Sequence, residues 1–359
     1  MISMKRMLHI VGGMYPGGLE NFIMNIYRNL DRDKVQFDVI VHSIREGDYT
    51  KEIEAAGGKV YLAPRKSRHP LGNFLAIRKI VKENGYQVVI RHSDNAFPVL
   101  DLLAAWMGGA KKRIYQSHSS NSSHVGLHKF FRMFMGWIPT DRFACSENAG
   151  VWMYGNRACQ IVKNAIDVEQ YRFSHQLREQ ARREWQMEDC TVYSHVGIYM
   201  PAKNHKFLVE FFAEIVKKQP NARLLLIGEG GLREEIERQV KELHLEKQVI
   251  LTGIRSDVPK LLQMTDVFLF PSIYEGLPLS VIEAQAAGLP CLISNRITKE
   301  VVVTEQVVRM SPDEPKERWA EQAVALSENP RDSYAVTSQE LVRKAGYDVR
   351  DLAEWYARL

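Results

Sequence analysis

The 359-residue sequence lacks a long apolar run and a strong excess of charge, and both absences exclude classes of protein. No apolar run approaches about eighteen residues, so we expect no helix that crosses a bilayer. The segment MISMKRMLHIVGG has too few apolar residues before its two glycines for a secretory signal, and we interpret it as a first strand. The net charge of +5 is modest, and we expect no nucleic-acid partner.

Cysteine occurs only four times, at positions 145, 159, 190 and 291, and no two cysteines form a CxxC pair. This spacing does not indicate a zinc site. All four lie in or beside strand-like runs, which favours reduced thiols in the core of a cytosolic protein. We therefore expect a cytoplasmic location.

A chain of this length is too long for one ordinary core, which predicts two domains. Apolar strand-like runs alternate with helical stretches, and this alternation predicts two doubly wound parallel sheets in an α/β fold. Strands are expected at 7–11, 36–42, 59–63, 86–91, 113–117, 142–145 and 160–163, and again at 191–197, 222–227, 249–251, 267–270 and 291–294. We place the domains at 1–167 and 168–336, followed by a final helical segment at 337–359.

The stretch Phe268–Ser294 combines a strand, a loop and a short helix with two carboxylates. Pro278 suits the first helical position, and Gly288 marks the end of the helix. The free N–H groups and positive dipole end of such a helix attract phosphate. Glu275 in the loop and Glu283 in the helix would flank a bound anion, so their expected partners are hydroxyl groups. Together these features fit a nucleotide sugar, although a solvated turn and cap would explain either carboxylate alone.

Four glycines, at 12, 13, 17 and 18, surround the turn between the first strand and a helix at 19–30. Such a turn lets backbone approach a phosphate, but it does not match the fingerprint GxGxxG of nicotinamide enzymes. His118 follows the strand at 113–117, at the sheet edge where ligands gather. A histidine there can polarise or hydrogen-bond a reacting group. His124 and His128 are weaker candidates that we interpret as surface residues.

Taken together, EGLPLSVIEAQAAGLPCLIS resembles the signature of retaining nucleotide-sugar glycosyltransferases of family 4, two carboxylates separated by seven residues. The resemblance extends along nearly the whole chain, because further segments follow in the family's order: HIVGGMYPGGLENFIMNIYRNL, YQSHSS, ACSENAG, IVKNAIDVEQY, KNHKFLVEFF, LIGEGGLREEIE and VILTGIRSDV. It implies the GT-B fold, in which two Rossmann-like domains face a cleft and the last helix returns to the first domain. It also implies a role in bacterial exopolysaccharide or capsule synthesis.

The resemblance implies two catalytic residues, His118 and Glu275, which would contact the donor sugar. It further implies a set of donor-binding residues, namely Gly17, Gly18, Lys203, Arg255, Gly276, Leu277 and Glu283. Among these, Glu283 is expected at the ribose and Arg255 near the base. No metal and no cofactor other than the nucleotide-sugar co-substrate are implied.

The sequence departs from the family at position 198. Family members carry Gly-Arg and, several residues later, Lys-Asn, and both cations hold the diphosphate. Here Lys203 and Asn204 are present, but Ile198 stands where the arginine would be. Loss of a guanidinium removes a charge-assisted hydrogen bond to phosphate. Three explanations remain open: another arginine substitutes, the donor is bound differently, or the protein is an inactive member.

The prediction is a hexosyltransferase that moves a sugar, with retention, from a UDP-type nucleotide sugar to an acceptor hydroxyl. The acceptor is expected to be a lipid-linked or growing cell-surface polysaccharide, and retention follows from the resemblance alone. One alternative is a nucleotide-sugar 2-epimerase of the same fold. The other, motivated by Ile198, is an inactive partner subunit that binds a sugar nucleotide.

The stretch Leu127–Ile138 interleaves apolar and aromatic residues with Lys129 and Arg132. Its apolar side either packs on the sheet, which we favour, or rests in part on a bilayer that carries a lipid-linked acceptor. In the second case the protein is peripheral on the inner membrane face. Basic clusters at 65–68 and 111–113 permit contact with an anionic surface.

Overall fold

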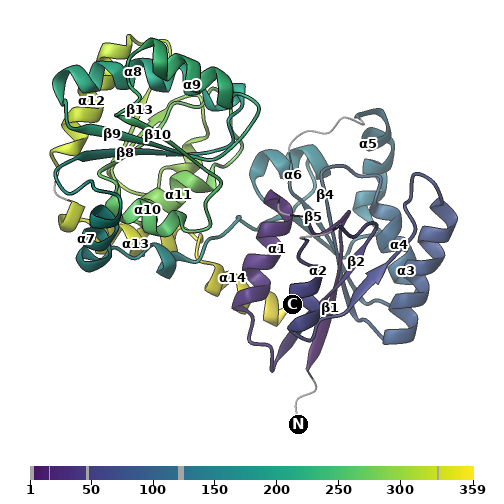
Figure 1. Ribbon diagram of the computed structural model, residues 1–359. Coiled ribbons are helices and arrows are strands. Elements are labelled where there is room, and N and C mark those ends of the chain that lie inside the picture. Colours follow the sequence, from purple (N-terminus) through teal and green to yellow (C-terminus); the bar gives the residue numbers. More distant parts are fainter. Residues whose placement is uncertain (1–3, 16, 46–47, 120–124, 330) are drawn as a thin grey trace. The chain divides into compact units, whose positions relative to one another are not determined.

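The computed structural model describes residues 4–15, 17–45, 48–119, 125–329 and 331–359, which form two compact units (Figure 1). Unit 1 comprises Met1–Ala165 and Val349–Leu359, and unit 2 comprises Ile166–Asp348. Each unit has one parallel sheet covered by helices. The two doubly wound sheets expected from the sequence are therefore confirmed.

The sheet of unit 1 has seven strands in the order β3-β2-β1-β4-β5-β6-β7. The strands are β1 (Lys5–Ile10), β2 (Val35–Val41), β3 (Val60–Leu62), β4 (Val88–Ser93), β5 (Lys112–Ser117), β6 (Asp141–Ala144) and β7 (Gln160–Ile161). Every pair is parallel. The strand order reverses between β1 and β4, and in doubly wound sheets ligands bind beyond the carboxyl ends of the strands at such a switch point.

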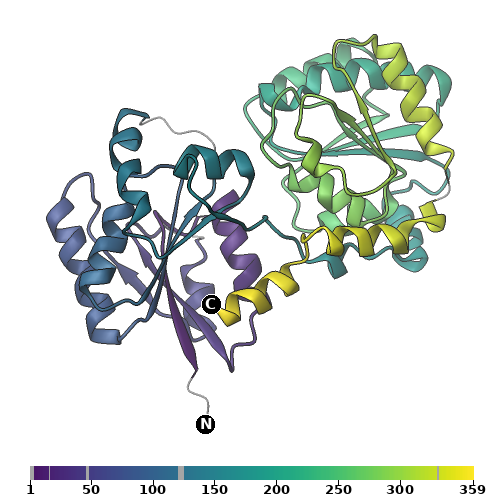
Figure 2. The same cartoon turned by 180° about the vertical axis from the view of Figure 1, so that it is seen from behind.

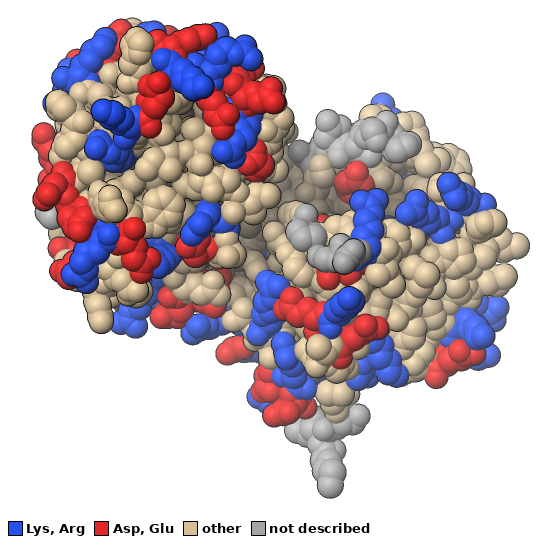
Figure 3. All heavy atoms as spheres, in the orientation of Figure 1, with Lys and Arg blue, Asp and Glu red and all other residues tan. Residues whose placement is uncertain are grey.

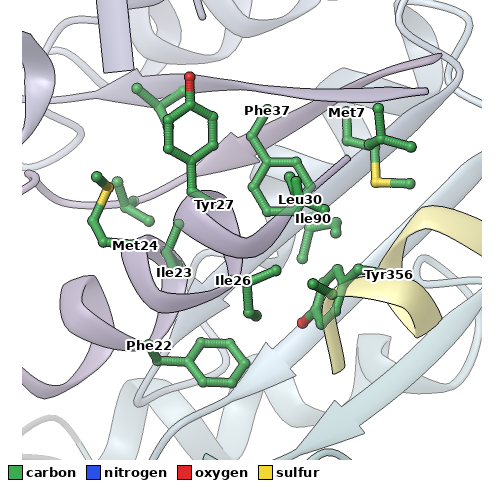
Figure 4. Close-up of a cluster of buried hydrophobic side chains, with 14 of the residues drawn as sticks. Met7, Phe22, Ile23, Met24, Ile26, Tyr27, Leu30, Phe37, Ile90 and Tyr356 are labelled. Carbon is green, nitrogen blue, oxygen red and sulfur yellow. The ribbon is translucent and has the colours of Figure 1, made fainter. Parts of the chain in front are cut away.

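Helices of unit 1 cover this sheet. They are α1 (Gly18–Asn29), α2 (Thr50–Ala55), α3 (Pro70–Asn84), α4 (Val99–Met107), α5 (Val125–Arg132), the 3₁₀ turn η1 (Met133–Gly136), α6 (Glu147–Tyr154) and α14 (Val349–Arg358). Of these, α1 and α4 bury many of their apolar residues. Figure 4 shows Phe22, Ile26 and Tyr27 of α1 beside Phe37 of the sheet and Tyr356 of α14. These fully buried side chains attach the end of the chain to unit 1.

The sheet of unit 2 has six parallel strands in the order β10-β9-β8-β11-β12-β13. They are β8 (Thr191–Val196), β9 (Ala222–Ile227), β10 (Val249–Gly253), β11 (Val267–Phe270), β12 (Cys291–Ser294) and β13 (Val307–Met310). The central strands β11 and β12 are buried along their whole length, which explains their continuous apolar sequences. The switch point lies between β8 and β11.

Helices on unit 2 include two that shape the loops at this switch point, η3 (Pro201–Lys203) and α11 (Leu279–Ala286). The remaining ones are η2 (Val168–Tyr171), α7 (His175–Glu184), α8 (His205–Lys218), α9 (Arg233–Glu242), α10 (Val258–Met264), η4 (Lys299–Val301), α12 (Lys316–Ser327), η5 (Arg331–Ser333) and α13 (Ala335–Lys344). Acidic and basic side chains are intermingled on the face of unit 2 shown in Figure 3.

The end of the chain differs from the expectation of one helical segment from residue 337. Gly346 has φ of +81°, a conformation that ends a helix, and the chain turns there. The helix before the turn, α13, belongs to unit 2, where Val342 and Tyr347 are buried near α11. Only α14 belongs to unit 1 (Figure 2). Strand β13 was also missing from the sequence prediction.

Candidate functional site

An ion pair joins the two loops at the switch point of unit 2. Lys203 ends η3 after β8, Glu275 lies in the loop after β11, and Nζ of Lys203 is 2.7 Å from Oε1 of Glu275. Their side chains are 14% and 17% exposed, so solvent can still reach them. The ammonium group also lies 4.7 Å from the centre of the Phe270 ring. Two residues far apart in the sequence thus meet where a ligand is expected.

Hydrogen bonds between the loops fix this arrangement. The backbone N–H of Ile273 donates to the carbonyl of Ala202 at 2.8 Å. The side-chain amide of Asn204 donates to the carbonyl of Pro271 at 3.2 Å. Asn204 has φ of +59°, and its left-handed conformation separates η3 from α8. Lys203 is consequently held opposite the β11 loop.

Helix α11 begins directly after this loop. Pro278 is its N-cap and not its first helical residue as expected, so the helix begins one residue later, at Leu279. A side chain built on Gly276 would meet no atom within 4 Å, so the space next to this backbone is open. Leu277 is partly buried against the apolar core below. The loop therefore offers exposed backbone beside the positive end of a helix.

Glu283 lies one turn further along α11 and is largely buried. It accepts a hydrogen bond from the hydroxyl of Tyr171, which η2 supplies. Loss of water around the carboxylate raises the pKa of Glu283 to about 6. Tyr171 was missed as a site residue; the only signal was its position at the end of IVKNAIDVEQY.

The other two predicted features of unit 2 lie on separate loops. Arg255 follows β10 and makes two hydrogen bonds of 2.7 Å to the carboxylate of Asp257. Its guanidinium is also 5.7 Å from the Trp185 ring. Ile198, where the family carries arginine, is 62% exposed and places an apolar side chain in solvent next to the β8 loop. A base contact by Arg255 remains a prediction.

In unit 1, His118 lines a cavity of about 410 Å³ beyond the carboxyl ends of β1, β4 and β5. Gly18, at the first position of α1, and Asn164 line the same cavity. The side-chain oxygen of Asn164 is buried and has no hydrogen-bond partner among the residues that the structure describes. Asn164 was not predicted, although it lies in the segment KNAID that resembles the family.

The turn before α1 is open to solvent on one side. A side chain on Gly18 would meet no atom within 4 Å, whereas one on Gly17 would come within 2.7 Å of the Glu20 carboxylate. Gly17 is the N-cap in an extended conformation that any residue can adopt, and the near atom is the end of the flexible Glu20 side chain, which can move aside. The helix therefore begins with exposed N–H groups at the cavity that His118 lines.

Three histidines form a chain of contacts across neighbouring strands. Nε2 of His118 lies 2.9 Å from Nδ1 of His92, and Nε2 of His92 lies 2.9 Å from Nδ1 of His9. Burial lowers the pKa of His9 to about 3 and the pKa of His92 well below its usual value. His118 is partly exposed, yet the surrounding protein atoms also lower its pKa. All three rings are therefore neutral at pH 7.

The interpretation of His128 as a surface residue was wrong. Its ring is buried, stacks on Trp152 with centroids 4.1 Å apart, and accepts a hydrogen bond from the Ala96 N–H at 3.1 Å. It has a structural role in holding α5. His124, the other weak candidate, lies outside the described residues.

The apolar stretch that contains α5 and η1 is only partly packed on the sheet. Met135 and Ile138 are buried, but Phe130, Met133 and Trp137 are 59%, 58% and 54% exposed. Over the described part of the chain, no helix is long and apolar enough to cross a membrane. Within the same residues, no three His, Cys, Asp or Glu side chains gather closely enough to hold a metal ion.

Comparison with known families assigns both units to sugar-transfer enzymes. The family described as Glycosyltransferase Family 4 matches residues 16–170, and the one described as Glycosyl transferases group 1 matches residues 178–343. "Putative glycosyltransferase EpsF" of Bacillus subtilis is 32% identical over 97% of this chain and 94% of its own length. An Escherichia coli enzyme named UDP-Gal:alpha-D-GlcNAc-diphosphoundecaprenol alpha-1,3-galactosyltransferase is 25% identical over 72% of each chain.

Among solved structures, Anabaena HepE in complex with UDP superimposes with a TM-score of 0.82 over 99% of both chains, at 19% identity. WaaG, a glycosyltransferase of lipopolysaccharide biosynthesis, gives a TM-score of 0.68 over 98% of both chains, at 17% identity. These similarities establish a common fold.

Proposed function

The chain belongs to the family 4 glycosyltransferases with the GT-B fold, and we propose that it transfers a hexose from a UDP-sugar to a lipid-linked acceptor with retention of configuration. Unit 2 binds the donor, and unit 1 supplies His118 and binds the acceptor. The transfer contributes to the synthesis of a cell-surface polysaccharide.

The observation that carries this proposal is the Lys203–Glu275 pair beside the amino end of α11. The diphosphate of an incoming donor offers Lys203 a more highly charged partner than Glu275 does. Once Lys203 turns to the phosphates, Glu275 is free to accept hydrogen bonds from the sugar hydroxyls. Before the donor binds, the ion pair therefore holds Lys203 and Glu275 in position and leaves neither charge unpaired.

During transfer, the bond between the anomeric carbon and the donor phosphate oxygen breaks, and the electron pair stays on the diphosphate. The acceptor oxygen bonds to the anomeric carbon on the same face, and its proton passes to the leaving phosphate oxygen. Lys203 and the N–H groups around Gly276 stabilise the developing charge, a contribution of the kind that oxyanion holes make. Neutral His118 acts as a hydrogen-bonding group near the sugar and does not change its charge near pH 7.

The nature of donor and acceptor is supported by the relatives' names. The Escherichia coli relative is named for a UDP-linked sugar and an acceptor on diphosphoundecaprenol. Structures of HepE were solved with UDP and with UDP-glucose. The clustered exposed apolar side chains of α5 and η1 supply a surface suited to a lipid-linked acceptor.

Radiolabelled UDP-sugars, incubated with the protein and a bacterial lipid extract, test the proposal. Label should enter the organic phase, and Glu275→Ala or His118→Ala should lower the rate by about 10²–10³-fold. Glu242→Ala, on the exposed face of α9, is the control. Near-native transfer by either site variant would refute the assignment.

Two further measurements use the same assay. An epimer formed from the donor alone, without acceptor, would favour the epimerase. Activity that is lost in EDTA and restored by manganese would contradict metal independence.

The exposed surface of Phe130, Met133 and Trp137 is proposed to rest on the membrane that carries the acceptor. Lys129 and Arg132 lie on the same segment and suit anionic headgroups. The double variant Phe130→Ser/Met133→Ser should reduce flotation with phosphatidylglycerol vesicles about tenfold, because it removes two apolar anchors. Leu71→Ser, which changes a more exposed apolar residue on α3, should float like the unmodified protein. Equal flotation of both variants would contradict the contact.

A further inference from the structure

A second cavity of unit 1, of about 610 Å³, lies beyond the carboxyl ends of β2 and β4. It is lined by Gly12, His42, Ser43, Arg65, Lys66, Ser67, Arg91, Asn95, Phe97, Pro98 and Leu127. Three of these residues are cationic, and none is a carboxylate. A pocket of this composition favours an anionic ligand.

Two of the cations share a single buried carboxylate. Nζ of Lys66 is 2.6 Å from Oδ1 of Asp101, and Nε of Arg91 is 3.0 Å from Oδ2. All three side chains are at most 12% exposed. Although the distances are short, neither Nζ of Lys66 nor Nε of Arg91 has a well-aligned acceptor among the described residues. One negative charge therefore faces two positive charges that retain unused hydrogen-bonding capacity.

The rim of the cavity adds further donors. Arg65 is exposed, and its guanidinium has no carboxylate or hydrogen-bond partner within the described part of unit 1. Nε2 of His42 is buried and likewise has no partner among the described residues, and it can donate in the tautomer whose Nδ1 accepts from Asn73. Arginine binds phosphate through two parallel hydrogen bonds, whereas ordinary surface lysines act as point charges. Arg65 and Lys66 together thus present both kinds of contact to one ligand.

Part of the cavity lining is apolar. Phe97 and Pro98 face the cavity, and the Lys66 ammonium lies 5.3 Å from the centre of the Phe97 ring. Leu127 belongs to α5, the helix that also carries exposed Phe130. Cationic groups together with an apolar lining that includes Leu127 of α5 match a ligand with a charged and a lipid part.

We propose that this cavity binds the diphosphate of the lipid-linked acceptor, with Arg65 and Lys66 as its principal ligands; this inference rests on the proposed function. The lipid would leave the cavity along α5. Burial lowers the pKa of Lys66 to about 8. Asp101 is shared with Arg91, so a bound diphosphate would give the Lys66 ammonium a second anionic partner.

Calorimetric titration of the full chain with inorganic pyrophosphate in EDTA tests the site. Pyrophosphate also suits Lys203 in unit 2, so all measurements use the Lys203→Gln variant. We expect one remaining site, whose affinity falls about tenfold on adding Arg65→Gln, the loss of one charge-assisted pair. Adding Arg68→Gln, which removes a charge from the same loop but does not line the cavity, should change affinity less than twofold. Equal affinity in both variants, or no binding, overturns the proposal.

Measurement of KM for two acceptors distinguishes a failure of this inference from a failure of the proposed function. In an otherwise unmodified chain, Arg65→Gln should raise KM about tenfold for a short-chain prenyl diphosphate sugar, and should leave KM unchanged for an alkyl glycoside of the same sugar. Equal effects on both acceptors would refute the diphosphate site while transfer itself stands. Pyrophosphate binding without any transfer would instead refute the proposed function. If phosphatidylglycerol vesicles bind Arg65→Gln about tenfold more weakly while pyrophosphate affinity is unchanged, the cavity recognises membrane lipid and the proposal fails.

Discussion

The first six strands of the two sheets follow the same order and have the same switch point, but the side chains at those switch points differ. In unit 2, Lys203 and Glu275 are charged, partly exposed and paired. In unit 1, His9, His92 and His118 are neutral and largely enclosed. The depth of these side chains therefore determines whether each acts through charge or through neutral hydrogen bonds, and in unit 1 the cation Arg91 lines the same cavity as His92 and His118.

The cause of this difference is the position of the residues along their strands. His9 and His92 lie within β1 and β4, so the sheet and its helices surround them. Lys203, at the end of η3, and Glu275, in the loop after β11, lie several residues beyond the strands β8 and β11, where each is the other's ionic partner. Glu283 is the exception in unit 2, because it is a carboxylate on a buried part of α11.

Glu283 provides the largest expected effect in this comparison, because it is a buried ionisable group in the unit whose switch-point pair is partly exposed. Its folded pKa of about 6 exceeds the ordinary value of 4.5, so the folded state binds the proton more tightly than the unfolded state does. This contribution to stability is full below pH 4.5 and is lost as pH rises through 6. The shift corresponds to about 2 kcal/mol.

Glu283→Gln should therefore raise the free energy of unfolding of unit 2 by about 1–2 kcal/mol at pH 8 and by almost nothing at pH 4.5. Glutamine keeps an oxygen that can accept the Tyr171 hydrogen bond. Urea unfolding at both pH values measures the difference, with Glu242→Gln on exposed α9 as control. A stability gain that is equal at the two pH values would mean that ionisation of Glu283 is not its source.

The sequence predicted those features that depend on neighbouring residues. The apolar run Val267–Phe270 and the breaks at Pro278 and Gly288 located β11 and α11 to within one residue. Strand β13 (Val307–Met310) was missed because it is short and mostly half-exposed, so it lacks the continuous apolar pattern of β12. The break between α13 and α14 depends on one glycine in an otherwise helical segment.

Contacts between distant residues could not be predicted. Lys203 and Glu275 meet because β8 and β11 are neighbours at the switch point, although they are separated by two strands in the sequence. The histidine chain likewise needs the order β1-β4-β5. Pattern and spacing identified His118, but nothing local indicated that His9 stands behind it.

A substitution at Ile198 tests whether an added cation at the switch point of unit 2 strengthens donor binding. Its side chain is 62% exposed, so arginine fits there without burial. Ile198→Arg should lower the donor KM about tenfold, because a charge-assisted hydrogen bond to phosphate contributes roughly 1.5–3 kcal/mol before the side chain is ordered. Ile198→Gln, without the charge, is the matched control. An unchanged KM in the arginine variant would indicate that the donor diphosphate lies away from this loop.

The smallest effect is expected at His9, the buried end of the three-histidine chain. The protonated nitrogen of His9 determines which ring donates and which accepts in both contacts of that chain. Each neutral ring carries one N–H, and each of the two contacts requires one. If His9 donates from Nδ1, its Nε2 is merely an acceptor without a partner among the described residues. In the opposite polarity that nitrogen would be an unpaired buried N–H, which is the more costly state. His118 therefore carries its proton on Nδ1, the nitrogen not engaged by His92.

His9→Leu removes the donor that sets this polarity, so His118 should shift partly to the tautomer protonated on Nε2. The loss of one neutral hydrogen bond should lower kcat/KM about threefold. Nitrogen-15 NMR of labelled histidines measures the tautomer directly, and His9→Asn, whose amide can donate from a similar position, should restore it. A proton found on Nε2 of His118 in the unmodified protein would show that the histidine hydrogen bonds point the other way. His9 would then not determine whether His118 offers a ligand a donor or an acceptor.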